Sequence, residues 1–214
     1  MIPPALVDLL GSNVELGTAA VAVVLVGVLA RVWFGSALFH PRHVTAWNVL
    51  RRVLTPVLQR VIYHKLPFNI EIENESHSVE YAATVEAPPA ELATTIDDVR
   101  EVEVPLLAGF KTAPDGRRER GTFVWHIGSR PFDSAPRWLR RYQVHPTLFE
   151  REDGSYDVYA HREANSYRPD LWADHLLKGA SFSADKGVRK MQNALDDADV
   201  EWRVDHPDAA VEGA

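Results

Sequence analysis

The longest apolar stretch of the chain lies near its N-terminus. Residues 17–30 read GTAAVAVVLVGVLA without a charge, and residues 16–39 contain Arg31 as their only charged residue. A helix needs about 20 apolar residues to cross the hydrocarbon core of a bilayer, and an arginine near its end can extend the guanidinium to the headgroups. We therefore expect one transmembrane helix over residues 16–39, preceded by an extracytoplasmic segment of residues 1–15.

Two other structures would contain the same apolar run. A signal peptide carries positive charge before its apolar region, whereas residues 1–16 contain no Lys or Arg. A buried helix of a soluble protein needs fewer uncharged residues than a membrane span, and residues 17–30 are long enough for one. Of the three interpretations, the transmembrane helix agrees best with the length and the flanking charges.

A second apolar pattern, within the basic segment of residues 40–70, has the period of a helix. Over residues 47–66 (WNVLRRVLTPVLQRVIYHKL) aliphatic pairs recur at every fourth position, which places an apolar stripe on one side and basic residues opposite. Pro56 is expected to kink or restart this helix, because proline lacks an N–H group. The periodicity does not distinguish between three partners for the apolar stripe: lipid, the soluble domain and a second subunit. If the partner is lipid, these residues contact the membrane surface: Arg42, Arg51, Arg52, Arg60 and Lys65.

The remaining pattern predicts a soluble α+β domain over residues 71–202 and a frayed tail over residues 203–214. Alternating apolar and polar positions and turn residues define its elements. The predicted strands cover residues 78–85, 108–112, 121–127, 142–150 and 156–163, and the predicted helices cover residues 87–98, 169–177 and 183–198. This order predicts an antiparallel sheet with helices packed on one face.

The strands over residues 142–150 and 156–163 are predicted to form a hairpin. Asp153-Gly154 between them is a favoured pair for a tight turn. A hairpin folded symmetrically about this pair places Pro146, not His145, opposite His161. Pro146 also predicts an edge strand or a bulge, because proline cannot donate a ladder hydrogen bond.

The charge changes sign between these two parts of the chain. Residues 1–70 contain six basic and two acidic residues, a balance of +4, so the formal net charge of −7 leaves −11 for residues 71–214. Basic residues follow the apolar stretch and none precedes it, which places the N-terminus outside the cell and the domain in the cytoplasm. Phosphates of nucleic acids would repel this acidic domain, so we expect no nucleic-acid partner.

Histidines are the main candidates for chemistry in the domain. The chain contains no Cys, which excludes disulfides, thiolate catalysis and Cys-ligated metals. It also contains no nucleophile elbow and no glycine-rich phosphate loop, so we identify no catalytic or cofactor-binding residue. His126, His145 and His161 lie on three predicted strands and His175 on a predicted helix. They would ligate zinc or another divalent ion if three of them met, and ordinary hydrogen bonding is their alternative role.

A basic cluster with interleaved aromatic residues lies at residues 137–142. Its arginines, Arg137, Arg140 and Arg141, would suit a surface that binds lipid phosphate or RNA. Within an acidic domain, ion pairs with nearby carboxylates are the alternative. If the domain lies close to the membrane, we expect this patch to face it.

Residues 78–163, which include SVEYAATVEAPPAEL and YQVHPTLFEREDGSYDVYAHRE, resemble a group of uncharacterised membrane-anchored proteins of halophilic archaea. His145, Thr147–Phe149 and Asp157–His161 carry this likeness most clearly. It implies an N-terminal span and a small α+β domain, and it implies no particular activity. The sequence VEAPPAEL and the long closing helix also resemble helix-grip (START-like) lipid-binding domains, in which a C-terminal helix lies across the sheet.

These features predict a single-pass membrane protein whose cytoplasmic domain binds a partner protein or a second copy of itself, or organises at the membrane surface. We expect this function to be non-enzymatic and to need no cofactor, although an enzyme stays open as an alternative. The main rival is the binding of a lipid or another small apolar ligand in a groove under the C-terminal helix.

Overall fold

The computed structural model describes residues 40–52, 75–105, 111–127, 139–171, 174–175 and 179–205. The predicted N-terminal segment, the predicted transmembrane helix over residues 16–39, and Arg60, Lys65 and Arg137 lie outside the described residues. Within the described stretches, no helix combines the length and the apolar character that a membrane span requires.

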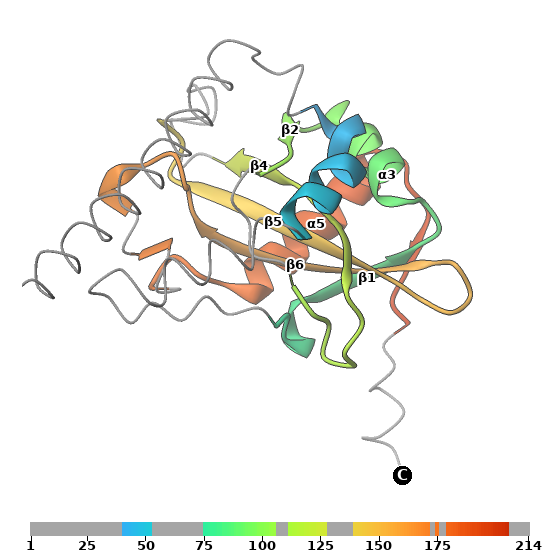
Figure 1. Ribbon diagram of the computed structural model, residues 1–214. Helices are drawn as coiled ribbons and strands as arrows, with labels where there is room; N and C mark the ends of the chain where they lie inside the picture. Colours follow the sequence, from blue (N-terminus) through green and yellow to red (C-terminus); the bar gives the residue numbers. More distant parts are fainter. Residues whose placement is uncertain are drawn as a thin grey trace, which may run out of the picture.

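The centre of the fold is an antiparallel sheet on which two helices, α3 (Pro89–Asp97) and α5 (Ala184–Asp197), are packed (Figure 1). In the described part of the chain the sheet has seven strands in the order β2-β4-β5-β6-β1-β7, and β3 also pairs with β5. The strands are β1 (Tyr81–Val85), β2 (Val102–Glu103), β3 (Glu119–Thr122), β4 (Val124–Ile127), β5 (Tyr142–Glu150), β6 (Tyr156–Ala164) and β7 (Trp202–Arg203). The predicted α+β class and the predicted antiparallel sheet are confirmed.

The two long predicted helices form close to their expected bounds. Ser183 caps α5, since its side chain accepts a hydrogen bond from Lys186 N. The predicted helix over residues 169–177 is represented among the described residues by a 3₁₀ turn, η4 (Pro169–Leu171), and by residues 174–175. Of the predicted strand over residues 108–112, the described end forms no strand but two isolated bridges, from Thr112 to Glu75 and from Thr112 to Arg118. Arg203, assigned to the tail, belongs to β7 instead.

The two faces of the β5–β6 hairpin differ in chemistry although both are buried. One face joins α3 and α5 in the main hydrophobic cluster, to which these elements contribute Leu92, Ala93, Ile96, Val144, Leu148, Val158, Ala160, Met191, Ala194 and Leu195. Side chains alternate along a strand, so the intervening residues lie on the opposite face. That face is largely polar and carries Gln143, His145, Thr147, Asp157, His161 and Glu163, all buried.

The hairpin forms as predicted, but its register differs by one residue. The ladder runs from Tyr142↔Ala164 to Glu150↔Tyr156, so that His145 lies directly opposite His161. Within the connecting loop Gly154 has a φ of 87°, and its N–H donates to Arg151 O. A type I′ turn needs positive φ at two successive residues, and Asp153 does not have it. The prediction that Pro146 lies opposite His161 is therefore wrong.

Pro146 lies in a central strand rather than at an edge of the sheet. β5 pairs with β6 on one side and with both β3 and β4 on the other. The break between β3 and β4 falls at Phe123, whose N–H donates to Pro146 O over 3.3 Å. Because Pro146 offers no N–H in return, the neighbouring strand is interrupted here and the single strand predicted for residues 121–127 is divided in two.

Residues 44–52 form a helix that lies beside α3 (Figure 1). Its first residue, Val44, is fully buried in the hydrophobic core. Arg51 Nη2 forms an ion pair with Glu119 Oε1 at 2.6 Å, and the two side chains are 2% and 0% exposed. Asn48 Nδ2 donates to the backbone oxygen of Glu119 over 3.3 Å. The helix is therefore docked on the domain through Val44 in the core and through the polar side chains of Asn48 and Arg51.

This docking reverses the orientation expected for the amphipathic segment in its described part. Val49 and Leu50, which belong to the predicted apolar stripe, are 58% and 43% exposed. Arg51, predicted to contact lipid headgroups, is buried against Glu119 and has no free surface for that contact, so this prediction is wrong. Arg42 and Arg52 of the same predicted set are exposed.

Candidate metal centre

Three side chains with metal-ligand chemistry converge on the polar face of the hairpin. His161 and Glu163 are two residues apart on β6 and share a face, and the register places His145 of β5 across from His161. One ligand atom from each of the three lies within 4.8 Å of the other two. All three residues are buried, with 8%, 2% and 7% exposure for His145, His161 and Glu163.

Glu163 is at the centre of the cluster. Its Oε1 accepts a hydrogen bond from Gln143 Nε2 (2.7 Å) and lies 3.2 Å from His145 Nδ1, while its Oε2 lies 3.5 Å from His161 Nε2. Burial by itself would raise the pKa of this carboxyl group. Hydrogen bonds with His145 and His161 outweigh burial and hold the pKa well below its usual range. Glu163 is therefore an anion that several groups hold in one orientation.

His161 is oriented from its other ring nitrogen. Its Nδ1 lies 3.0 Å from Glu80 Oε2, which comes from the 3₁₀ turn η2 (Ser78–Glu80), and 3.5 Å from Lys111 Nζ. A carboxylate on the far nitrogen of a histidine fixes the ring and its tautomer, as in many metal sites. The Phe182 ring, with its centroid 5.0 Å from that of His161, covers one side of the imidazole. The Nε2 atom thus points at Glu163 with little rotational freedom.

His145 supplies an unused nitrogen. Its Nε2 is buried and has no hydrogen-bond partner among the described residues. Burial lowers the pKa of His145 to about 4, so the ring is neutral near pH 7 and one of its nitrogens carries a lone pair. An unpaired polar atom in the interior is unfavourable by roughly 1–3 kcal/mol. A cation bound at this nitrogen would use the lone pair and remove the penalty.

The charges around the three residues also favour a cation. Two buried carboxylates, Glu80 and Glu163, face one buried ammonium group, Lys111, whose Nζ lies 3.9 Å from Glu80 Oε2. With neutral histidines the cluster has an excess of one negative charge. A divalent ion would reverse that excess, and a proton on His161, between the two carboxylates, would neutralise it. The geometry accommodates either, and the two alternatives predict different behaviour on exposure to metal.

The sequence identified two of these three residues. His145 and His161 meet, whereas His126 does not join them: its Nε2 lies 3.8 Å from Glu103 Oε1, and its ring packs on Tyr167. His175 lies at the margin, with Nδ1 2.9 Å from Ala164 O and 3.6 Å from Glu163 Oε2. Glu163, Glu80 and Lys111 were not predicted. The one local signal for Glu163 is its spacing of two from His161 on a predicted strand, which places both on one face.

The basic cluster has a different environment from this centre. Arg140 Nη1 donates to His126 O over 2.8 Å, and Nη2 forms an ion pair with Glu101 at 3.2 Å. The Arg141 guanidinium lies 5.6 Å from the centroid of the Tyr142 ring. Arg140 thus makes the local carboxylate pair that was the alternative to a phosphate-binding role.

The likeness to membrane-anchored proteins of halophilic archaea and the likeness to helix-grip domains stay predictions. Comparison with known protein families, with curated proteins and with solved structures finds no match to this chain. We therefore infer the function from the geometry of the cluster.

Proposed function

We propose that this protein binds a divalent transition-metal ion through His145, His161 and Glu163. The observation that carries the proposal is the convergence of their three ligand atoms, within 4.8 Å of one another, in the interior of the domain. Two imidazole nitrogens and one carboxylate oxygen form a set that zinc and non-haem iron use, with coordination positions left for water or a further ligand. Magnesium and calcium prefer oxygen ligands alone, which makes them poor candidates.

Such an ion would have a structural or binding role rather than a catalytic one. The ligands are almost fully buried, so a substrate has little access to the metal. The ion would link β5 and β6 to each other and, through Glu80 on His161, to the turn η2. A metal bound in the folded state alone stabilises that state. This agrees with the non-enzymatic function predicted from the sequence.

The test is metal binding by the full-length chain after removal of metal with EDTA. We expect one Zn²⁺ or Co²⁺ per chain, measured by elemental analysis after desalting and by isothermal titration calorimetry. His161→Gln and Glu163→Gln should each weaken the affinity by about 100-fold or more, because each removes one of three ligands. His126→Gln is the matched control, since it changes a buried histidine of the same sheet outside the cluster, and its affinity should equal that of the wild type.

A different result would replace the proposal by the protonated alternative. If the stripped wild-type chain takes up no more metal than His161→Gln, the cluster is a hydrogen-bonded network with an imidazolium between two carboxylates. Thermal unfolding of each variant, followed by circular dichroism, separates loss of the site from loss of the fold.

We also propose that the domain is anchored at the cytoplasmic side of the membrane by residues 16–39. The apolar length of that stretch and the basic residues after it support this topology. Further support comes from the helix at residues 44–52, where exposed Val49 and Leu50 adjoin exposed Arg52. Apolar and basic groups on one exposed surface suit the headgroup region of a bilayer.

Membrane anchoring predicts that the full-length chain sediments with membranes and resists alkaline extraction, whereas a chain without residues 1–39 does not sediment. Protease added to intact spheroplasts should leave the domain uncleaved, and lysis should expose it. Full-length protein in the soluble fraction without detergent would exclude the anchor, and cleavage in intact spheroplasts would exclude the cytoplasmic side.

A further inference from the structure

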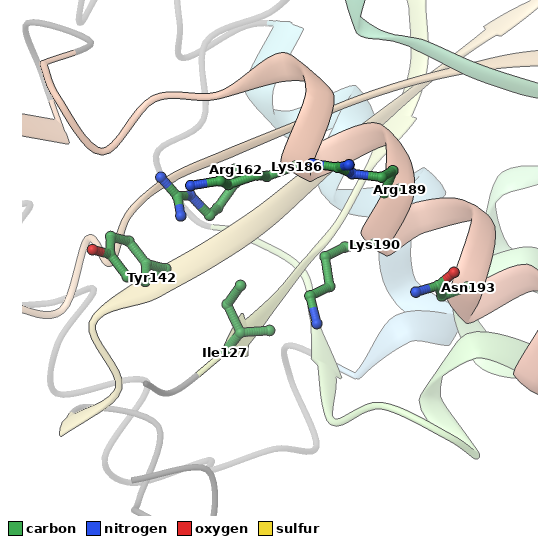
Figure 2. Close-up of a pocket in the computed structure, with 7 residues that line it drawn as sticks. All are labelled: Ile127, Tyr142, Arg162, Lys186, Arg189, Lys190 and Asn193. Atoms are coloured by element: carbon green, nitrogen blue, oxygen red, sulfur yellow. The ribbon is translucent and has the colours of Figure 1, made fainter. Parts of the chain in front are cut away.

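A pocket lies between α5 and the ends of three strands, on the core side of the sheet. Its volume is about 380 Å³, and its lining combines Ile127, Tyr142 and Arg162 from the strands with Lys186, Arg189, Lys190 and Asn193 from α5 (Figure 2). Sites for small molecules have volumes of roughly 300–1,000 Å³. The pocket therefore has the size of a site for a small metabolite or a lipid headgroup.

The lining is cationic although the domain as a whole is acidic. Arg162, Lys186, Arg189 and Lys190 line the pocket, and none of the carboxylates that the structure describes does. Arg189 forms an ion pair with Asp185, whereas neither Lys186 nor Lys190 pairs with a carboxylate in the described part of the chain. The two lysines are four residues apart on α5, a spacing at which like charges repel along a helix. An anion bound between the two ammonium groups would attract both of them and offset their repulsion.

Arg162 is held in position without a ligand. Its Nε and Nη2 donate to Ser181 O over 3.1 and 2.9 Å, and its guanidinium lies 4.3 Å from the centroid of the Tyr142 ring. Figure 2 shows Arg162 beside Tyr142, and Lys190 extending from α5 toward Ile127. A guanidinium that is already ordered loses little entropy when it binds an anion. Tyr142 and Ile127 add an apolar wall, which an inorganic ion would not use.

We infer that this pocket binds an organic phosphate. The cationic side chains of the pocket contact the phosphate group of the ligand, and the apolar wall contacts its carbon skeleton. Arginine and lysine are the usual partners of phosphate groups. The ligand class differs from the apolar ligand predicted for a groove under the C-terminal helix, because the lining is charged. The pocket is separate from the metal cluster, since Arg162 and His161 lie on opposite faces of β6. Its ligand can be tested whether or not the cluster binds metal.

The experiment uses the full-length chain in detergent for soluble phosphates and in nanodiscs for lipids. The soluble probes are glycerol 3-phosphate and inorganic phosphate, titrated by calorimetry, and the nanodiscs contain phosphatidylcholine with or without phosphatidylglycerol. In both settings, acylation of Lys186 and Lys190 is measured by mass spectrometry. The pocket variant is Lys186→Gln with Lys190→Gln, and its control is Arg118→Gln with Arg120→Gln, which removes the same charge on and beside β3.

A soluble ligand predicts that glycerol 3-phosphate binds more tightly than inorganic phosphate, with an affinity about tenfold weaker in the pocket variant and unchanged in the control. A lipid ligand predicts that phosphatidylglycerol alone protects Lys186 and Lys190 from acylation, in the wild type and in the control. Either result supports the inference and identifies the source of the phosphate. Equal binding by both variants, or no binding and no protection, would overturn it.

Discussion

Gly187→Ala is expected to lower the free energy of unfolding by about 3 kcal/mol, although it replaces a poor helix former with the best one. A Cβ atom at Gly187 would lie 2.2 Å from His161 Cα and 2.3 Å from His161 C. These are backbone atoms of β6 and cannot rotate away, so α5 would have to move off the sheet. Propensity alone predicts the opposite sign, a gain of about 1 kcal/mol. Urea denaturation of the full-length chain, followed by circular dichroism, measures the difference.

Gly154→Ala is the matched control for this substitution. Gly154 has a φ of 87° and no atom within 4 Å of the position of a Cβ, so alanine there meets strain but no clash. We expect a loss of about 1 kcal/mol. The displacement of α5 in Gly187→Ala should also disturb His161 and weaken metal binding, which Gly154→Ala should not do. If Gly187→Ala unfolds at the same urea concentration as the wild type or a higher one, α5 does not approach β6 this closely.

The hairpin shows how far the sequence could predict the candidate metal centre. The alternating pattern predicted both strands, and Asp153-Gly154 located the turn, but the turn type decides the register. Because only Gly154 adopts positive φ, the loop is longer than two residues and His145 replaces Pro146 opposite His161. A shift of one residue moves every side chain to a different partner. The meeting of the two histidines therefore depended on a backbone angle that the sequence does not fix.

The other members of the cluster could not be predicted from the sequence for a different reason. Glu80, Lys111 and Glu163 are far apart in the chain and come together only through the tertiary fold. Residue spacing identifies metal sites when the ligands lie on one local element, as in two histidines on a helix. The two-residue strands β2 and β7 were missed likewise, because two residues are too few to show an alternating pattern. Local elements were predictable, and contacts between distant segments were not.

Arg51→Met is expected to destabilise the protein by about 3–5 kcal/mol, the usual effect of leaving a buried charge without its partner. Glu119 is 0% exposed, and its carboxylate oxygens are shared between Arg51 Nη2 at 2.6 Å and Lys111 N at 2.9 Å. Among the described residues, removal of the arginine leaves only the Lys111 N–H to hydrogen-bond this carboxylate. Urea denaturation of the full-length chain in mild detergent gives the free energy, and Arg42→Met provides the control. Arg42 is exposed and its side chain contacts the neighbouring His43 rather than Glu119, so we expect a change within about 0.5 kcal/mol there.

The double variant Arg51→Met with Glu119→Leu tests whether the loss comes from the unpaired charge or from loss of the helix contact. Arg51 Nε and Nη1 are buried without a hydrogen-bond partner among the described residues, so the ion pair is itself incompletely satisfied. Replacing both members of such a pair with apolar residues is often neutral or stabilising. We therefore expect the double variant to recover most of the stability lost in Arg51→Met. If Arg51→Met is as stable as Arg42→Met, the helix at residues 44–52 is not docked through this pair, and the outward orientation of Val49 and Leu50 loses its basis.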